Sequence, residues 1–269
     1  MKVIDQMNRS IEFPESVQRI FSLVPSQTEL LVDLGLEDYI VGVTKFCVHP
    51  KHLRLSKKVV GGTKIISLAK IKAINPDIIL CNKEENTKAI VEACEQICNV
   101  HVSDIFRIED SLDLINLYGI LFNKKEEALK IVNEIQKEAD DFKAFIQKKP
   151  TLKVVYFIWK TPWMIAGKDT FINYMLGLNH FKNVYETKKR YPEIVLNKST
   201  INKAVDLVLL SSEPFPFKNS HKKEVQTFYP NAKIIIADGE MFSWYGSRLT
   251  KAFAYFKNLR LNLEAFQAL

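Results

Sequence analysis

Nine residues of the first third of the chain, Thr44–His52 or "TKFCVHPKH", place a thiol and two imidazoles close together. Cys47 and His49 could be ligands of a metal ion, or Cys47 could be a nucleophile with His49 as its base. A single Cys-x-His motif supplies two ligands at best, and no further ligand follows at a zinc-like spacing. The sequence therefore predicts no metal site and no catalytic residue here, and an enzymatic Cys47/His49 site stays open as the alternative.

Aromatic residues stand in the polar loops of the second half of the chain. Trp and Tyr in such loops are typical of contact surfaces for a large flat ligand. They also occur in the core when they end a strand, so a structural role stays open for each. The candidates are Trp159, Tyr185, Tyr191, Phe242 and Trp244.

Acidic residues follow two apolar runs at equivalent places. Glu84 and Glu85 come after the run that ends at Cys81, and Glu213 comes after the run that ends at Ser211. Carboxylates near helix N-termini are favoured by the helix dipole, which is the structural interpretation. The functional interpretation is that one carboxylate on each lobe docks a two-fold partner that carries arginines.

Short apolar runs alternate with helical patterns in the first half and predict a small α/β lobe. Ser26 followed by Glu29 has the spacing of a capping box, which predicts a helix that starts there directly after a strand. The strands are expected at 20–24, 40–44, 77–81 and 100–103, and the helices near 27–34, 68–74 and 86–97.

A long charged helical pattern separates this lobe from a second one. The pattern ends at Pro150 and predicts a single helix of about 25 residues, nearly 40 Å long at about 1.5 Å per residue. Strand patterns then restart at 153–159, 206–211 and 232–237. The fold class is therefore α/β, with two lobes built on mostly parallel sheets (1–110 and 151–269), bridging helices (111–150) and a ligand cleft between the lobes.

Composition excludes several classes of protein. The 269 residues carry a formal charge of +7, but the basic residues are scattered in short pairs such as Lys57 and Lys58, which argues against nucleic acid. No window approaches a membrane span, and the first residues lack the apolar core of a signal peptide. The four cysteines are expected to be unpaired thiols.

Motifs spread over the whole chain resemble those of class III ABC-transporter substrate-binding proteins, the helical-backbone metal-receptor superfamily, and are most similar to its cobalamin-binding members. The motifs are an early hairpin with Asp5 and Arg9, "RI.SLVPS.TE.L..LG" from Arg19, "VGVT", "VVGG", "I..INPDIIL" from Ile71, and "G.SRLT.A" near the end.

The resemblance implies a protein without enzymatic activity that binds a metal chelate and delivers it to an ABC transporter. Cobalamin (vitamin B12) or another corrinoid is the favoured ligand, and no covalent cofactor is expected. An iron siderophore stays open because Lys45, Lys83 and Arg248 would suit an anion, and haem stays open because His49 with Tyr185 or Tyr191 could bind its iron.

The resemblance also implies roles by position. Ligand contacts fall on Pro25, Ser26, Phe46, His49, Trp159, Tyr185, Tyr191, Phe242, Trp244 and Arg248, and permease docking falls on Glu213 and on Glu84 or Glu85. The expected partners are the chelate and a permease dimer, with the protein itself a monomer. Members of the family are periplasmic or membrane-anchored, whereas this chain opens on the family's first hairpin, so a removed signal and a cytoplasmic location are both open.

Overall fold

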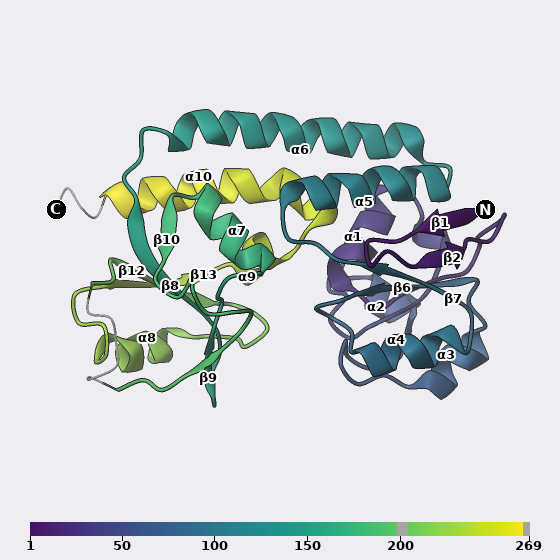
Figure 1. Cartoon of the computed structure of the whole chain (residues 1–269), viewed down its shortest axis with the longest axis horizontal. Coiled ribbons are helices and arrows are strands. Elements are labelled where there is room, and N and C mark those ends of the chain that lie inside the picture. The colour runs from purple at the N-terminus through teal and green to yellow at the C-terminus, as the bar shows by residue number, and fades with distance from the viewer. Residues whose placement is uncertain (198–203, 266–269) are drawn as a thin grey trace. The chain divides into compact units, whose positions relative to one another are not determined.

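The computed structural model describes residues 1–197 and 204–265, which form two compact units (Figure 1). Unit 1 comprises residues 1–135 together with the short segment Tyr245–Arg248, and unit 2 comprises 136–244 and the chain from Leu249 onward. Both are α/β units, so the predicted fold class is confirmed.

Unit 1 is built on a five-stranded parallel sheet with the order β5-β4-β3-β6-β7. Its strands are β3 (Ile20–Ser22), β4 (Ile40–Val43), β5 (Lys58–Val59), β6 (Ile78–Asn82) and β7 (Asn99–Ser103). All five residues of β6 are buried, as expected for a central parallel strand covered on both faces. Gly42 of β4 lies under Phe21, because a Cβ there would stand 2.1 Å from that ring.

Helices cover both faces of this sheet (Figure 1). Helices α3 (Leu68–Ile74) and α4 (Lys88–Glu95) lie on one face, and α1 (Pro25–Asp33) and α5 (Ile108–Leu121) lie on the other. The remaining helical pieces of this part are η1 (Glu37–Tyr39) and α2 (Leu53–Ser56). Every strand and helix predicted for the first lobe is present within a few residues of its expected bounds.

The start of α1 differs from the expectation. The helix begins at Pro25 with Val24 in an extended conformation before it, and no side chain caps it. Ser26 is thus already inside the helix, and Glu29 pairs with Arg248, 219 residues further along the chain. The predicted capping box is wrong because a tertiary ion pair takes the carboxylate that the motif would have used.

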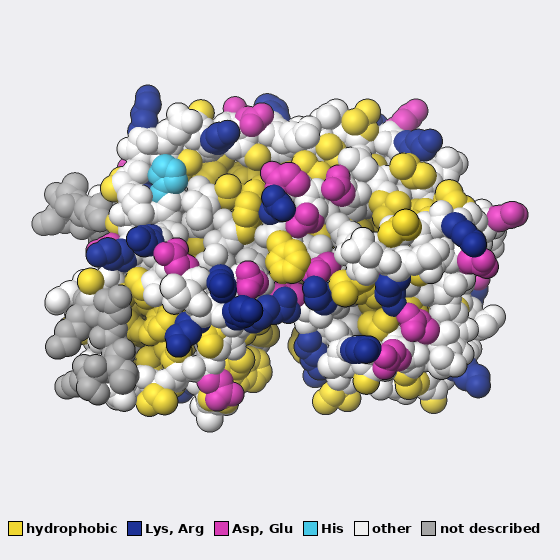
Figure 2. Space-filling view, viewed as in Figure 1, with side chains coloured by type: hydrophobic (Ala, Val, Ile, Leu, Met, Phe, Trp, Pro, Cys, Tyr) yellow, Lys and Arg dark blue, Asp and Glu magenta, His cyan; other side chains and the backbone are white. Residues whose placement is uncertain are grey.

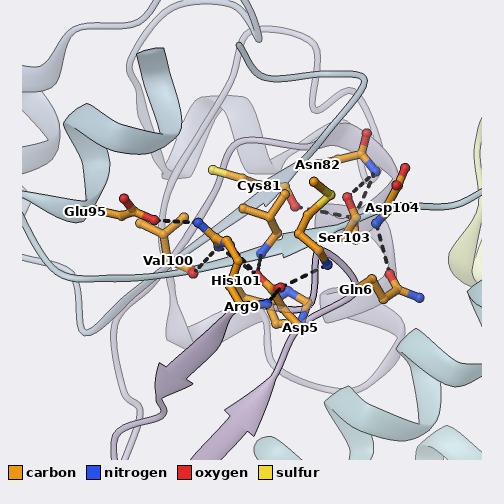
Figure 3. A network of polar contacts seen from close by, with 12 residues as sticks. Asp5, Gln6, Arg9, Cys81, Asn82, Glu95, Val100, His101, Ser103 and Asp104 are labelled. Carbon is orange, nitrogen blue, oxygen red and sulfur yellow. Dashed lines mark hydrogen bonds and ion pairs between the residues drawn. The ribbon is translucent and has the colours of Figure 1, made fainter. Parts of the chain in front are cut away.

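The N-terminal hairpin of β1 (Lys2–Ile4) and β2 (Ser10–Glu12) is fixed to the edge strand β7 by a polar network (Figure 3). The Asp5 carboxylate accepts hydrogen bonds from the backbone of Val102 and Met7 and from the guanidinium of Arg9. Arg9 in turn donates to the carbonyl oxygen of Val100 at 2.9 Å. The hairpin therefore covers the open edge of the sheet, which an exposed strand would otherwise offer for aggregation.

Unit 2 is built around the long strand β8 (Leu152–Trp159). Strands β12 (Leu207–Ser211) and β13 (Lys233–Ala237) continue the sheet on one side in parallel. On the other side, β10 (Phe181–Asn183) runs parallel to the first half of β8, and β9 (Trp163–Ile165) runs antiparallel to its end. Strand β11 (Glu193–Ile194) pairs antiparallel with β9 and completes the six strands.

The helices of this part are α7 (Phe171–Leu178), α8 (Asn219–Gln226), α9 (Gly239–Ser243) and α10 (Leu249–Ala265), whereas the turn η2 (Gly246–Arg248) belongs to unit 1. The long helix α6 (Lys125–Ile146) has 22 residues, about 33 Å at about 1.5 Å per residue, and its residues divide between the units after Ile135. The long helix predicted from the charge and apolar pattern is thus present, slightly shorter than expected.

Phe242 is fully buried in an aromatic core of unit 2. Its ring centroid lies 4.8 Å from that of Phe256 and 5.2 Å from that of Tyr156. Phe242, which the sequence offered as a ligand contact, is thus a core residue in this structure, because helix α9 after β13 directs its side chain inward.

Candidate functional site

Open parallel sheets bind ligands at the carboxyl ends of their strands, where loops leave backbone amides and side chains free to vary. In each unit this edge carries most of the residues that the sequence had singled out.

In unit 1 the exposed aromatic side chain at this edge is Phe46, which follows β4. Its side chain is 47% exposed, and the Lys45 ammonium lies 5.0 Å from the ring centroid. The ring rests on Gly62, where a Cβ would stand 3.0 Å from it. Phe46 therefore offers a supported flat apolar surface with a cation beside it.

Pro25 and Ser26 lie at the same edge but are buried. The next residue, Gln27, is fully buried and donates from Nε2 to the Tyr245 hydroxyl at 2.9 Å and to the Ser103 hydroxyl at 2.7 Å. Ser26 also bonds the Tyr245 hydroxyl, and burial raises the pKa of that phenol. The edge of β3 is thus packed by the returning segment Tyr245–Arg248.

Arg248 is buried as well, although the sequence interpretation offered it to a ligand. Its Nε donates to Oε2 of Glu29 at 2.8 Å, and only 6% of each side chain is exposed. Its observed role is to neutralise a buried carboxylate.

Cys47 is fully buried, and its sulfur lies 3.1 Å from the Thr28 hydroxyl and 3.3 Å from the Thr44 hydroxyl. Burial raises the pKa of this thiol, whereas a nucleophilic cysteine needs a lowered one. His49 is partly exposed. Within residues 1–197 and 204–265, no group of three His, Cys, Asp or Glu side chains could hold a metal ion, and all four cysteines are free thiols.

Glu84 and Glu85 lie in a rigid turn after β6. Their backbone amides donate to Oδ1 of Asn82 at 2.8 and 3.2 Å, and the side chain of Glu85 bonds Thr63. Burial raises the pKa of the Glu85 carboxyl above its ordinary value. Nearby, Lys83 is paired with Asp104 at 2.6 Å.

In unit 2 the corresponding edge carries an array of aromatic rings. Trp159 at the end of β8 is 38% exposed, and its ring meets Phe215 edge-on at a centroid distance of 5.6 Å. The ring centroid of Phe215 lies 4.8 Å from that of Phe217 and 5.5 Å from that of His221. Phe217 stacks on Trp163 at 6.0 Å and an interplanar angle of 15°.

Three members of this array, Phe215, Phe217 and His221, were missed in the sequence. The signal that could have revealed the two phenylalanines is the segment "EPFPF" after β12, in which prolines alternate with phenylalanines; His221 lies outside it, in α8. Proline fixes the backbone of such a loop, so the intervening rings can be held outside regular structure.

Glu213, expected to dock a partner, has an internal function in unit 2. Its Oε1 accepts hydrogen bonds from the Ser243 hydroxyl at 2.6 Å and from the Trp244 indole at 2.9 Å. Gly239 permits this approach, because a Cβ there would stand 2.6 Å from Cγ of Glu213. Trp244 itself is only 6% exposed, so its indole is held inside the fold rather than presented on the surface.

Tyr185 and Tyr191 lie beside the array's sheet, both partly buried. Tyr185 packs against the hydrophobic core cluster that contains Tyr229. The loop between them is pinned to Gly167, whose backbone amide donates to the Arg190 carbonyl at 2.7 Å.

Basic and acidic side chains are interspersed on the face shown in Figure 2, with apolar side chains between them. Some charged side chains of unit 2 form ion pairs, among them Lys149 with Glu264 at 2.7 Å. In the part of the chain that is described, no helix is long and apolar enough to cross a membrane.

Comparison with known proteins identifies relatives for this arrangement. A sequence profile described as periplasmic binding protein matches residues 20–229. The chain is 28% identical over 189 residues to the uncharacterized ABC transporter substrate-binding lipoprotein YvrC of Bacillus subtilis, a match that covers 66% of this chain and 59% of that protein. It is 24% identical to the vitamin B12-binding protein of Vibrio parahaemolyticus, over 68% of this chain and 67% of the relative.

A solved structure shares the fold. The periplasmic haem-binding protein of Pseudomonas aeruginosa superposes with a TM-score of 0.77 at 19% identity, over 91% of this chain and 93% of that one. None of these relatives supports the cytoplasmic alternative. The resemblance seen in the sequence is confirmed, and the chain belongs to the periplasmic binding protein family of ABC-transporter substrate-binding proteins.

Proposed function

We propose that the protein captures a flat metal chelate, with cobalamin or another corrinoid as the favoured ligand, and delivers it to an ABC permease. The observation that carries this proposal is the exposed ring of Trp159 on its support of further aromatic rings, at the sheet edge where ligands bind. A flat macrocycle gains more binding free energy on such a surface than a non-planar ligand, because ring stacking adds to the burial of apolar area.

Phe46 provides a similar surface in unit 1, at the equivalent edge of its sheet. We propose that Phe46 and Trp159 are the principal aromatic contacts. Further contacts are proposed for three partly exposed side chains, those of Tyr185, Tyr191 and His49. The similarity to a protein named vitamin B12-binding supports cobalamin over other chelates.

The ligand is cargo and not a covalent cofactor, and the protein acts as a monomer. We propose Glu84 for permease docking, with Glu85 as the weaker candidate because its side chain bonds Thr63 and burial raises the pKa of its carboxyl. Glu213 is less suited to that function, because its Oε1 already accepts two hydrogen bonds within unit 2.

The experiment that tests this function is isothermal titration calorimetry with cyanocobalamin, with hemin and a ferric siderophore as parallel ligands. Trp159→Ala and Phe46→Ala are each expected to weaken binding by about 1 to 2 kcal/mol, which is about fivefold to thirtyfold in Kd. Tyr39→Ala is the matched control, because Tyr39 has the same 38% exposure as Trp159 but precedes β4 at the opposite end of the strand.

Saturable binding of cyanocobalamin that is weakened by both substitutions and not by the control would support the proposal. Tight binding of hemin or of the siderophore in its place would transfer the function to that chelate. Equal affinities for the wild type and both alanine variants would remove the two aromatic surfaces from the binding site.

A further inference from the structure

The aromatic array of unit 2 ends in a histidine whose two ring nitrogens are in different environments. His221 lies in the first turn of α8, with its ring edge-on to Phe215 at 5.5 Å and perpendicular to Phe217 at 5.5 Å. Two aromatic neighbours therefore fix the plane of the imidazole, and its side chain stays partly exposed.

The tautomer of His221 follows from its contact with the backbone. The amide of Lys218 donates to Nδ1 of His221 at 2.8 Å. A ring nitrogen that accepts a hydrogen bond carries a lone pair and no proton, so the neutral imidazole has its proton on Nε2. Within the described residues, Nε2 has no hydrogen-bond partner of its own.

His221 is linked to Trp159 through one ring only, that of Phe215. The three side chains come from the end of β8, from the loop after β12 and from the start of α8, which all lie at the carboxyl edge of the sheet. A flat molecule on Trp159 and Phe215 would place its rim beside a fixed N–H donor.

We propose that His221 is a specificity-determining residue that donates its Nε2 proton to an acceptor oxygen on the rim of the chelate, an inference that rests on the proposed function. Phe215 lies between Trp159 and His221 and fixes the spacing between the stacking surface and the donor. The chemical class that fits is a planar chelate with peripheral amide or carboxylate oxygens, which includes corrinoids with their side-chain amides.

The same geometry separates two ways of using a histidine. Coordination of haem iron through Nε2 needs a lone pair on that nitrogen. In this structure the lone pair is on Nδ1 and is used by the Lys218 amide. His221 is therefore suited to recognise the rim of a chelate and not to bind its metal.

Three substitutions separate ligand recognition from the helix contact. His221→Glu keeps an acceptor for the Lys218 amide but has no N–H donor, whereas His221→Gln offers both. His221→Ala loses both and is compared with the other two by thermal unfolding, so that any loss of fold is seen. Trp159→Ala serves as the reference for loss of the stacking surface.

The first measurement is the tautomer of the unliganded protein, from long-range proton–nitrogen NMR correlations of the imidazole assigned with His221→Ala. The expected pattern has the proton on Nε2. The second is calorimetry with cyanocobalamin, for which His221→Glu and His221→Ala should raise Kd about threefold to tenfold and His221→Gln less than about twofold. The third is the absorption spectrum with hemin, which should not change between wild type and His221→Ala at the iron-ligation bands.

Either a proton on Nδ1 or equal cyanocobalamin affinities of wild type and His221→Glu would overturn the assignment. If His221→Glu binds cyanocobalamin as tightly as the wild type while Trp159→Ala binds it more weakly, the proposed function stands without His221. A hemin spectrum that depends on His221 would replace rim recognition with iron coordination. If the wild type binds neither cyanocobalamin nor hemin, the proposed function is refuted together with the inference.

Discussion

The buried ion pair between Glu29 and Arg248 gives the sharpest test of how unit 1 is held together. The change is Glu29→Gln, which keeps the shape of the side chain and removes its charge. The guanidinium of Arg248 would then be left as a buried cation, since only 6% of its side chain is exposed. A buried charge without its partner is strongly unfavourable.

The magnitude follows from this burial. Breaking a buried pair from one side costs about 3 to 5 kcal/mol, whereas an exposed pair contributes about 0 to 1 kcal/mol. A loss of that size is a large fraction of the about 5 to 15 kcal/mol by which a typical protein is stable. The matched control is Glu95→Gln, because Glu95 pairs with Arg9 in the same unit but is 42% exposed.

The assay is urea unfolding followed by two signals. All three tryptophans, Trp159, Trp163 and Trp244, lie in unit 2, so their fluorescence reports that unit, while far-ultraviolet circular dichroism reports both. If the units unfold separately, Glu29→Gln should shift the dichroism transition and leave the fluorescence transition in place. If they unfold together, both transitions should shift by the same free energy.

A loss of less than about 1 kcal/mol, equal to that of Glu95→Gln, would refute the argument. It would mean that water or rearrangement solvates Arg248 without Glu29. The double variant Glu29→Gln/Arg248→Met provides the second check, because replacing both charges should restore part of the stability that the single change removes.

Three further predictions concern single residues. Glu213→Ala should release the Trp244 indole, so that its N–H exchanges with solvent faster by NMR while that of Trp163 does not; an unchanged rate would disprove the anchoring. Cys47 should resist iodoacetamide in the native protein at pH 7 and react after unfolding, because burial raises its pKa, and rapid native labelling would revive the enzymatic alternative. Burial lowers the pKa of His101 to about 4, below its unfolded value of about 6.5, so the native state binds fewer protons than the unfolded state. The free energy of unfolding should therefore fall as the pH drops below about 6.5, by about 2 kcal/mol at pH 5. A urea midpoint that does not depend on pH in this range, or a fall that persists in His101→Phe, would contradict this.

The sequence was sufficient to predict the architecture, because apolar runs and helical patterns depend on local spacing. The predicted helix 68–74 has the bounds of α3, and the strands β6 and β12 follow continuous apolar runs. The short edge pieces β5, β10 and β11 were not predicted, since strands of two or three residues carry too little periodicity to stand out.

The candidate site was less predictable because it depends on contacts between distant residues. The capping box at Ser26 and Glu29 failed since Arg248, near the other end of the chain, takes the carboxylate. Likewise, Glu213 follows a strand in the manner of an exposed loop residue, yet Trp244 and Ser243 reach its carboxylate from a later turn. Local patterns do not contain partners that are 30 or 219 residues away.

The segment "FSWY" shows why the exposed aromatic rings, and not the aromatic-rich loops, define the proposed site. Phe242 belongs to the core of unit 2, the Trp244 indole is held by Glu213, and the Tyr245 hydroxyl joins the polar network around Gln27 in unit 1. Each of these rings already has its apolar area buried, so a ligand would gain little by touching it. Trp159, at 38% exposure, still has area to bury, and we therefore expect it to contribute more to ligand affinity than the buried aromatic residues after β13.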